Sequence, residues 1–255
     1  QDYNQELISK GGGIFPRSSK SITLSSEAQA VLGLETATLT PNALMTAILK
    51  AEADLLWFGG IGTYIRATSE NNADAGDRAN DAIRITAPQL RVKAIGEGAN
   101  LGITQKARIE AGLHGVKLNT DAIDNSAGVN SSDLEVNIKI ALGAAEQAQK
   151  LTRVDRNTLL VSMTEEVAAL VLRNNYLQTL SVSLTEAKNE NDFSYQARLM
   201  STLEASGLLD RDVEYLPDAV VLSERKEADQ WLSRPELAVL LAYAKIDLFS
   251  SLLES

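Results

Sequence analysis

The stretches ADLLWFGGIG (residues 53–62) and LRVKAIGEGANLG (residues 90–102) decide the fold. Each opens with a short run rich in apolar and β-branched or aromatic residues, which predicts strands at 53–58 and 90–95. Each run then passes into several glycines, which permit tight turns and close approach of other groups to the backbone. We therefore expect two strands that each end in a glycine loop.

A third stretch, VKLNTDAI (residues 116–123), predicts another strand, and DNSAG (residues 124–128) follows it. Helices are predicted at 41–51, where Pro41 suits a first helical turn, and at 104–113. Strands that alternate with helices indicate a parallel, wound sheet. Because so few strands are visible, we predict a partial Rossmann-like parallel sheet with helices, an α/β arrangement.

The second half of the chain has a different composition. Of the 16 glycines, only Gly207 lies beyond Gly143, and glycine disfavours helix interiors. Ser132 and Glu135 have the spacing of a capping box that would open a helix. The predicted helices cover 132–150, 155–178, 192–206 and 234–253, the last with Pro235 at its start. We therefore predict a cofactor-domain portion over 1–131 and an all-α helical domain over 132–255.

Charge and composition exclude several classes of function. Lys plus Arg number 24 and Asp plus Glu 34, so the net charge is −10, which disfavours nucleic acid and anionic membranes as partners. The chain has no cysteine and one histidine, His114, so thiolate sites and multi-histidine metal sites are excluded. The N-terminus QDYNQELISK is no signal peptide and lacks an initiator Met. We expect a cytoplasmic chain cut from a longer polypeptide, with no bound metal.

The polar residues of the loops suggest a ligand. In open α/β sheets ligands bind outside the carboxyl ends of the strands. Asn100 and Asn125 each offer an amide donor and acceptor, which suit a nicotinamide carboxamide or a ribose. Ser132, as an expected helix N-cap, would suit a substrate carboxylate. Ordinary turn and capping roles remain an alternative for each residue.

Longer strings resemble a known family. EGAN (97–100), NSAGV (125–129) and then Ser132 are similar to the cofactor-domain pattern of glutamate dehydrogenases. More specifically, six strings resemble the large bacterial NAD-dependent glutamate dehydrogenases, over essentially the whole chain. They are SKGGGIFPRSSKSI (9–22), DLLWFGGIGTYI (54–65), GDRANDAIRI (76–85), GEGANLGITQ (96–105), NTDAIDNSAGVNSSDLEVNIKI (119–140) and RPELAVLLAYAKIDL (234–248).

The resemblance implies a function and a set of sites. The family acts as a homo-oligomer that oxidatively deaminates L-glutamate with NAD to 2-oxoglutarate and ammonium. The implied cofactor-binding residues are Gly59, Gly60, Gly62, Thr63, Gly98, Ala99, Asn100 and Asn125, with Asn100 near the nicotinamide ribose and Asn125 at the carboxamide. The implied substrate-binding residues are Gly128, Val129 and Ser132, with Ser132 at the distal carboxylate of glutamate.

The resemblance also implies what the chain lacks. The family's phosphate-binding glycine turn, catalytic lysine and catalytic aspartate lie upstream of residue 1, so no catalytic residue is assigned here. The chain would be the C-terminal part of such an enzyme, inactive by itself. Phe58 departs from the pattern, which leads us to expect a polar Asn there.

Other interpretations stay open. LAVLLAYA in the last helix is apolar on nearly every side, so the chain could be a non-catalytic oligomerisation or scaffold module. A related amino-acid dehydrogenase acting on an apolar substrate is a further alternative. Asp121, Asp124 and Asp133 could form a magnesium cluster, although solvated or capping carboxylates explain them better.

Overall fold

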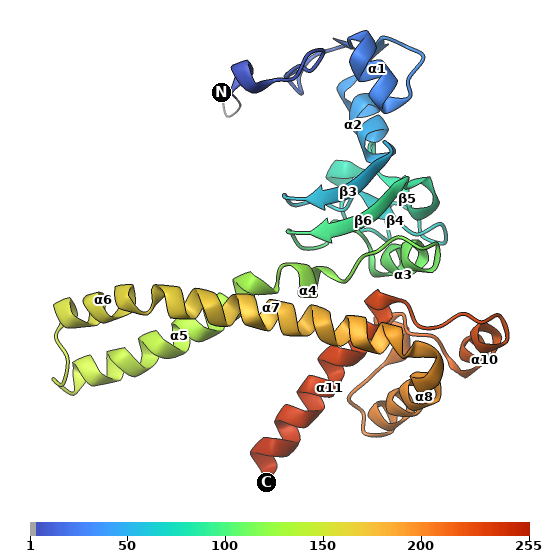
Figure 1. The fold of residues 1–255 in the computed structure, drawn as a ribbon. Helices are drawn as coiled ribbons and strands as arrows, with labels where there is room; N and C mark the ends of the chain where they lie inside the picture. Colours follow the sequence, from blue (N-terminus) through green and yellow to red (C-terminus); the bar gives the residue numbers. More distant parts are fainter. Residues whose placement is uncertain (1–3) are drawn as a thin grey trace. The chain divides into compact units, whose positions relative to one another are not determined.

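A computed structural model describes residues 4–255 (Figure 1). The chain divides into two compact units, Gln1–Leu118 (unit 1) and Asn119–Ser255 (unit 2), each treated by itself below. The division falls ahead of the predicted boundary at 131/132. The assignment of a cofactor-domain portion and a helical domain to 1–131 and 132–255 stays a prediction.

Unit 1 mixes short strands with helices. Its strands are β1 (Ile22–Thr23), β2 (Thr38–Leu39), β3 (Ala53–Phe58), β4 (Ile65–Arg66), β5 (Ile85–Thr86) and β6 (Val92–Glu97). Its α-helices are α1 (Ser26–Leu32), α2 (Pro41–Leu49) and α3 (Gln105–Leu113), and its 3-10 helices are η1 (Gln5–Leu7), η2 (Arg78–Asn80) and η3 (Ala87–Gln89). The predicted α/β character is confirmed in this unit.

The long strands β3 and β6 form a parallel pair, with Ala53 opposite Val92 and Phe58 opposite Glu97. The other sheets of the described chain are also two-stranded: β4 pairs with β5 in parallel, and β1 pairs with β2 antiparallel. The strand predicted at 53–58 is confirmed, and the one predicted at 90–95 is shifted to β6. The arrangement is a mixed, helix-rich α/β fold with small parallel sheets.

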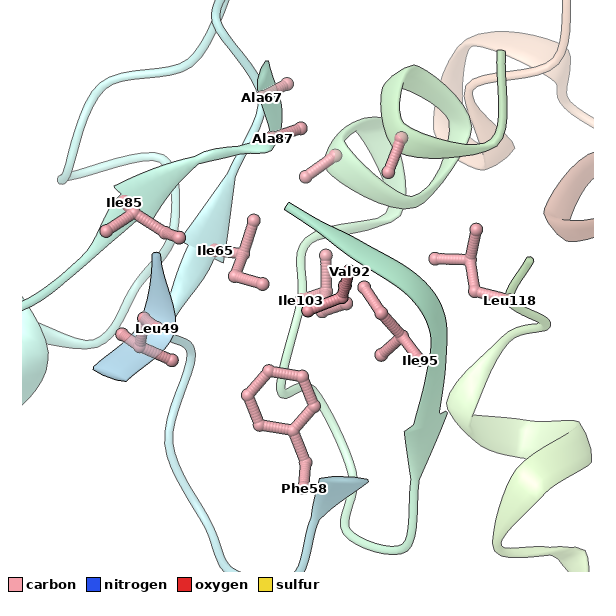
Figure 2. Packing of buried hydrophobic residues seen from close by; sticks show 12 residues of the cluster. Leu49, Phe58, Ile65, Ala67, Ile85, Ala87, Val92, Ile95, Ile103 and Leu118 are labelled. Atoms are coloured by element: carbon pink, nitrogen blue, oxygen red, sulfur yellow. The ribbon is translucent and has the colours of Figure 1, made fainter. Parts of the chain in front are cut away.

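An apolar cluster packs around the strands β3, β4, β5 and β6 of unit 1. Ile65 and Ile103 are fully buried, and Phe58 and Ile95 are nearly so. In Figure 2 these side chains point toward one another from β3, β4, β6 and the segment before α3. Burying a side chain of this size contributes about 1.5–3 kcal/mol. Phe58, the last residue of β3, and Ile95, near the end of β6, belong to the cluster, so it anchors the strand ends from which the loops leave.

Capping explains the helix starts of unit 1. The Thr40 hydroxyl accepts a hydrogen bond from the backbone N–H of Ala43 at 3.2 Å, and Pro41 follows it in the first turn of α2. Thr104 caps α3 in the same manner, toward the N–H of Ala107. Both predicted helices are confirmed, with ends within two residues of the prediction.

The strand predicted at 116–123 is wrong over its second half. Lys117 makes one parallel bridge to Ala94, and no named strand follows it among the described residues. The chain instead turns at Thr120 into the short helix α4 (Asp121–Asp124). Thr and Asp favour a helix start over a continued strand, and here that local preference outweighs the apolar alternation.

Unit 2 consists of helices, and none of its residues, 119–255, lies in a named strand. After α4 come α5 (Ser126–Gln147), α6 (Arg153–Ser162), α7 (Thr164–Ala187), α8 (Asn189–Ala205), α9 (Arg211–Glu214), α10 (Ala219–Glu227) and α11 (Arg234–Glu254). Helix α7 packs along α5 and contacts α11 (Figure 1). A second apolar cluster includes Val182, Phe193, Met200 and Leu237. The prediction of a helix-rich second half is confirmed.

Two helix boundaries differ from the prediction. Ser132 does not cap a helix, because α5 already begins at Ser126, whose buried hydroxyl donates to Asn175 Oδ1 at 2.5 Å. The helix predicted at 155–178 is divided at Met163 into α6 and α7. Beside the division, the Ser162 hydroxyl donates to the Leu159 carbonyl at 2.7 Å, a bond of the kind that bends helices.

The start of α11 is built as the sequence predicts, around Pro235. The buried Glu236 carboxylate accepts hydrogen bonds from the N–H and the hydroxyl of Ser233, both at 2.7 Å. Arg225 on α10 supplies the opposite charge at 2.9 Å. Glu236 therefore has its charge balanced and its oxygens hydrogen-bonded, as a buried carboxylate requires.

Tyr243 on α11 allows a prediction about alkaline pH. Its hydroxyl donates to Glu214 Oε1 at 2.6 Å, and this hydrogen bond, with burial and the carboxylate charge, raises the pKa of Tyr243 to about 12. The stability that this tyrosine contributes is complete below its ordinary pKa near 10 and is lost as the pH rises through about 12. Ultraviolet titration of tyrosinate should show a late step that Tyr243→Phe removes and Glu214→Gln moves to lower pH. A late step unchanged in Tyr243→Phe would assign it to another tyrosine.

Within residues 4–255, no helix combines the length and the apolar character needed to cross a membrane.

Candidate functional site

Two glycine loops leave the same edge of the β3–β6 pair. Because the strands are parallel and Phe58 lies opposite Glu97, both carboxyl ends face the same side. Loop 59–62 follows β3, and loop 98–102 follows β6. Gly59, Gly60, Gly98 and Asn100 are exposed there. The structure thus brings together the residues of unit 1 that the sequence singled out, at the edge where open α/β sheets bind ligands.

Thr63 joins the two loops. It is buried, and its hydroxyl donates to the Leu101 carbonyl at 2.8 Å. The N–H of the next residue, Tyr64, donates to the Gly102 carbonyl at 2.9 Å. The Thr63 hydroxyl is therefore used within the protein, so its contribution to the site is to fix one loop against the other.

The backbone of Thr63 is held from both sides by a distant segment. Its N–H donates to Asp77 Oδ2 at 2.8 Å, and its carbonyl accepts from Arg84 Nε at 2.9 Å. The Asn80 amide also donates to Asp77 Oδ2, at 2.6 Å. The Asn80 bond and the Thr63 N–H lower the pKa of Asp77, because both stabilise the charged carboxylate. Arg84 additionally donates to the Asp77 carbonyl and to Asp81.

The glycines of β6 and its loop make room for Trp57. A Cβ at Gly96 would lie 2.6 Å from the Trp57 ring, and one at Gly98 would lie 2.5 Å from it. A Cβ at Gly102 would lie 2.9 Å from the buried ring of Phe58. These glycines therefore permit close packing of β3 against the second loop. Phe58, where the family pattern led us to expect Asn, is a core residue stacked on Tyr64 with ring centroids 5.8 Å apart.

A buried ion pair stands immediately before the second loop. Arg108 on α3 meets the Glu97 carboxylate with Nε at 2.7 Å and Nη2 at 2.8 Å, the two-point geometry that suits guanidinium and carboxylate. Both side chains are at most 4% exposed. Glu97 ends β6, so the pair fixes the point from which Gly98–Asn100 leave the sheet.

An apolar hollow of about 260 Å³ opens beside the first loop. Gly59 and Gly60 form part of its wall, and Leu56, Phe58 and Tyr64 are among its apolar lining. Its volume falls below the ~300–1,000 Å³ of sites that enclose drug-sized ligands. The hollow could accept one ring or side chain, but it is too small to enclose a dinucleotide.

In unit 2, the remaining predicted residues lie at the start of α5. Asn125 stands at the break between α4 and α5, and Gly128, Val129 and Ser132 follow within the first two turns of α5. Steps of three and four residues place Gly128, Val129 and Ser132 on one side of the helix. All three are exposed, Val129 by 62%. They form a continuous strip that a ligand could contact.

Two sets of hydrogen bonds fix the chain around Asn125. Asn119 donates to Asp124 Oδ1 at 2.8 Å and accepts from Arg234 Nη2 at 3.0 Å. On the other side, Ser126 is bonded to Asn175 of α7. The segment that carries Asn125 is therefore held to α7 and α11 from both ends.

Sequence reasoning missed four residues that organise unit 1: Asp77, Arg84, Glu97 and Arg108. Asp77 and Arg84 belong to GDRANDAIRI, and Glu97 begins EGAN, so the strings were found without a role for their charges. The signal that the sequence offered was a charged residue next to a glycine, as at Asp77 and Glu97. For the magnesium alternative, no group of three or more His, Asp or Glu side chains in residues 4–255 is placed to hold a metal ion.

Comparison with known proteins shows the family of the chain. The family described as bacterial NAD-glutamate dehydrogenase, catalytic domain, matches residues 1–185, which include both glycine loops and the strip on α5. The chain belongs to this family.

Three curated relatives extend the match over the whole chain. The NAD-specific glutamate dehydrogenase of Pseudomonas aeruginosa is 52% identical over 254 residues, 100% of the chain. Its namesakes from Halomonas elongata and Mycobacterium tuberculosis are 48% identical over 100% and 46% identical over 97% of the chain. The chain spans only 16% of the length of each relative. The recognised resemblance to the large bacterial NAD-dependent enzymes is confirmed.

Proposed function

We propose that this chain is part of an enzyme that oxidatively deaminates L-glutamate to 2-oxoglutarate and ammonium with NAD. The observation that carries the proposal is 46–52% identity over nearly the whole chain to proteins named NAD-specific glutamate dehydrogenase. The shared edge of the two glycine loops supports it, because a dinucleotide needs close backbone approach at strand ends. We further propose that the β3–β6 pair belongs to a partial Rossmann-like parallel sheet.

The residues of unit 1 fit a cofactor contact. NAD, when bound, supplies the acceptor for the hydride that leaves the substrate. Gly59, Gly60 and Gly98 are exposed and carry no side chain that would keep a ligand from the backbone. Gly62, Ala99 and Asn100 complete the proposed cofactor contacts, with Asn100 near the nicotinamide ribose. Thr63, whose backbone and hydroxyl are bonded within the protein, would serve the cofactor site by fixing the two loops.

The strip in unit 2 supplies the proposed substrate contacts. Asn125 would donate and accept hydrogen bonds at the nicotinamide carboxamide. Gly128 and Val129 would line the pocket, and Ser132 would donate to the distal carboxylate of glutamate. Because Ser132 lies inside α5, its hydroxyl alone, rather than a helix N-terminus, would make this contact.

Substitutions in the complete polypeptide test these assignments. Ser132→Ala should raise the KM for L-glutamate about ten-fold or more, since hydrogen bonds to charged groups are worth about 1.5–3 kcal/mol. Asn125→Ala should lower kcat/KM for NAD by a similar factor. Ser131→Ala is the matched control: it removes the neighbouring hydroxyl, which points about 100° away around the helix. An unchanged KM for L-glutamate in Ser132→Ala, together with an unchanged kcat/KM for NAD in Asn125→Ala, would refute the site.

We also propose that the 255-residue chain is inactive alone, since the resemblance places the catalytic lysine and aspartate upstream of it. L-glutamate-dependent formation of NADH should appear with the complete polypeptide and be absent with this chain. Hydride transfer by the chain alone would contradict the proposal. L-valine serves as the apolar substrate that tests the related-dehydrogenase alternative.

A second candidate function, assembly, rests on the last turns of α11. Leu237 and Leu240 near its start are buried, whereas Ile246, Phe249 and Leu253 are 52–73% exposed. This exposed row, at steps of three and four residues, favours a helix contact in a homo-oligomer, and we propose a cytoplasmic homo-oligomer on the family resemblance. Sedimentation of the chain should give a species larger than one copy that Phe249→Glu dissociates. If the unmodified chain and Phe249→Glu both sedimented as monomers, the exposed row on α11 would not be an oligomer contact.

A further inference from the structure

We propose that Asp77 and Arg84 are positioning residues that hold the first glycine loop, 59–62, in its cofactor-binding conformation through Thr63. The proposal rests on the proposed function, and the experiment below separates the failure of one from the failure of the other. It adds to the site two charged residues that lie outside both loops.

The loop needs a fixed far end. It leaves β3 at the buried Phe58 and reaches the next buried residue at Thr63. Between them Gly59 and Gly60 are exposed, and Ile61 is 88% exposed. Glycines lose more conformational freedom on ordering than other residues. The conformation of such a loop is therefore set mainly by how firmly its ends are held.

Asp77 and Arg84 hold that end by its backbone. The Asp77 carboxylate accepts a hydrogen bond from the Thr63 N–H at 2.8 Å, and Arg84 Nε donates one to the Thr63 carbonyl at 2.9 Å. The peptide groups on both sides of Thr63 are therefore fixed. Because both partners are charged, the two hydrogen bonds are of the stronger kind. They act on main-chain atoms, so the side chain of Thr63 remains available for its bond to the second loop.

Arg84 is itself rigidly placed. Its side chain is fully buried, and its guanidinium also donates to the Asp77 carbonyl and to Asp81 Oδ1, the latter at 2.5 Å. Asp77 is held by Asn80. Asp77 and Arg84, together called the brace, therefore make these hydrogen bonds to groups of the protein itself. The brace needs no contact with a ligand, which is the arrangement expected of residues that position others.

The brace reaches the second loop as well. The Thr63 hydroxyl donates to Leu101, and Tyr64 donates to Gly102. Moving Thr63 would therefore displace both loops of the proposed cofactor site. A loss of the brace should weaken NAD binding more than glutamate binding, because the proposed glutamate contacts lie on α5.

The test uses the complete polypeptide with the variants Asp77→Ala, Asp77→Asn and Arg84→Lys. Asp77→Ala should raise the KM for NAD about ten-fold or more with the KM for L-glutamate little changed. Asp77→Asn keeps an acceptor oxygen and should recover part of the loss. Asp54→Asn is the control: it changes an exposed carboxylate at the opposite end of β3, paired with Lys93, and should leave both constants unchanged.

The outcomes separate cleanly. If the unmodified polypeptide does not reduce NAD with L-glutamate, the proposed function fails. If it does, and Asp77→Ala lowers kcat alone with the KM for NAD unchanged, Asp77 is merely structural and the inference is overturned. Should Asp77→Ala not fold, hydrogen exchange of folded Asp77→Asn decides: faster exchange confined to residues 59–63 and 98–102 supports the brace, and unchanged exchange there refutes it.

Discussion

Replacing Arg108 with alanine should destabilise unit 1 by about 3–5 kcal/mol, the cost of leaving one member of a buried ion pair without its partner. The Glu97 carboxylate is 1% exposed and would lose both of its contacts at 2.7 and 2.8 Å. Hydrogen exchange of peptides covering β3 and β6, measured on the 255-residue chain, should reveal this loss.

Lys93→Ala provides the comparison. It also removes a cation from an ion pair of unit 1, but Lys93 and Asp54 are both more than 80% exposed. Surface pairs are screened by water and contribute about 0–1 kcal/mol, so the exchange of β3 and β6 should barely change. If both substitutions changed the exchange of β3 and β6 equally, burial of the Glu97–Arg108 pair would not make it more stabilising than the surface pair.

Gly62→Ala should cost about 2 kcal/mol or more and should disturb Thr63 directly. Gly62 has φ of 128°, which residues with a side chain rarely adopt. A Cβ there would lie 2.6 Å from Asn80 Nδ2 and 2.8 Å from the Tyr64 hydroxyl. The substitution therefore combines backbone strain with displacement of the residue that holds Asp77.

In the complete polypeptide, Gly62→Ala should raise the KM for NAD, and in the 255-residue chain it should speed amide exchange at Thr63. For the exchange measurement Gly60→Ala is the matched control, because a Cβ at Gly60 meets no protein atom within 4 Å. If Gly60→Ala proved the more damaging in exchange, Gly62 would not owe its importance to its backbone conformation.

Local patterns predicted the elements whose formation is local. The run ADLLWF became β3 because its residues both favour a strand and supply Phe58 to the core. The same reasoning failed at 116–123, where Thr120 and the acidic residues after it start a helix. It failed at Ser132 because hydrogen bonding of Ser126 to α7 extends α5 backwards, a tertiary effect that no local spacing reports.

The candidate site was predictable only in part, for a similar reason. The two glycine loops could be paired from the sequence, because parallel strands end at one edge. The brace on Thr63 could not, since Asp77 and Arg84 are 14 and 21 residues away along the chain and act on backbone atoms. Charged side chains that bond to a main chain leave no periodicity in the sequence.

The packing of Trp57 across Gly96 and Gly98 has a practical consequence. The chain contains two tryptophans, and the other, Trp231, lies in unit 2 with its ring 5.2 Å from Phe193. Each unit therefore carries its own intrinsic fluorophore. With Trp231→Phe, the remaining tryptophan emission would come from the half-exposed indole of Trp57, which lies against Gly98 of the second glycine loop and beside Gly59 of the first. This tryptophan would be an optical probe that needs no label and reports the two loops.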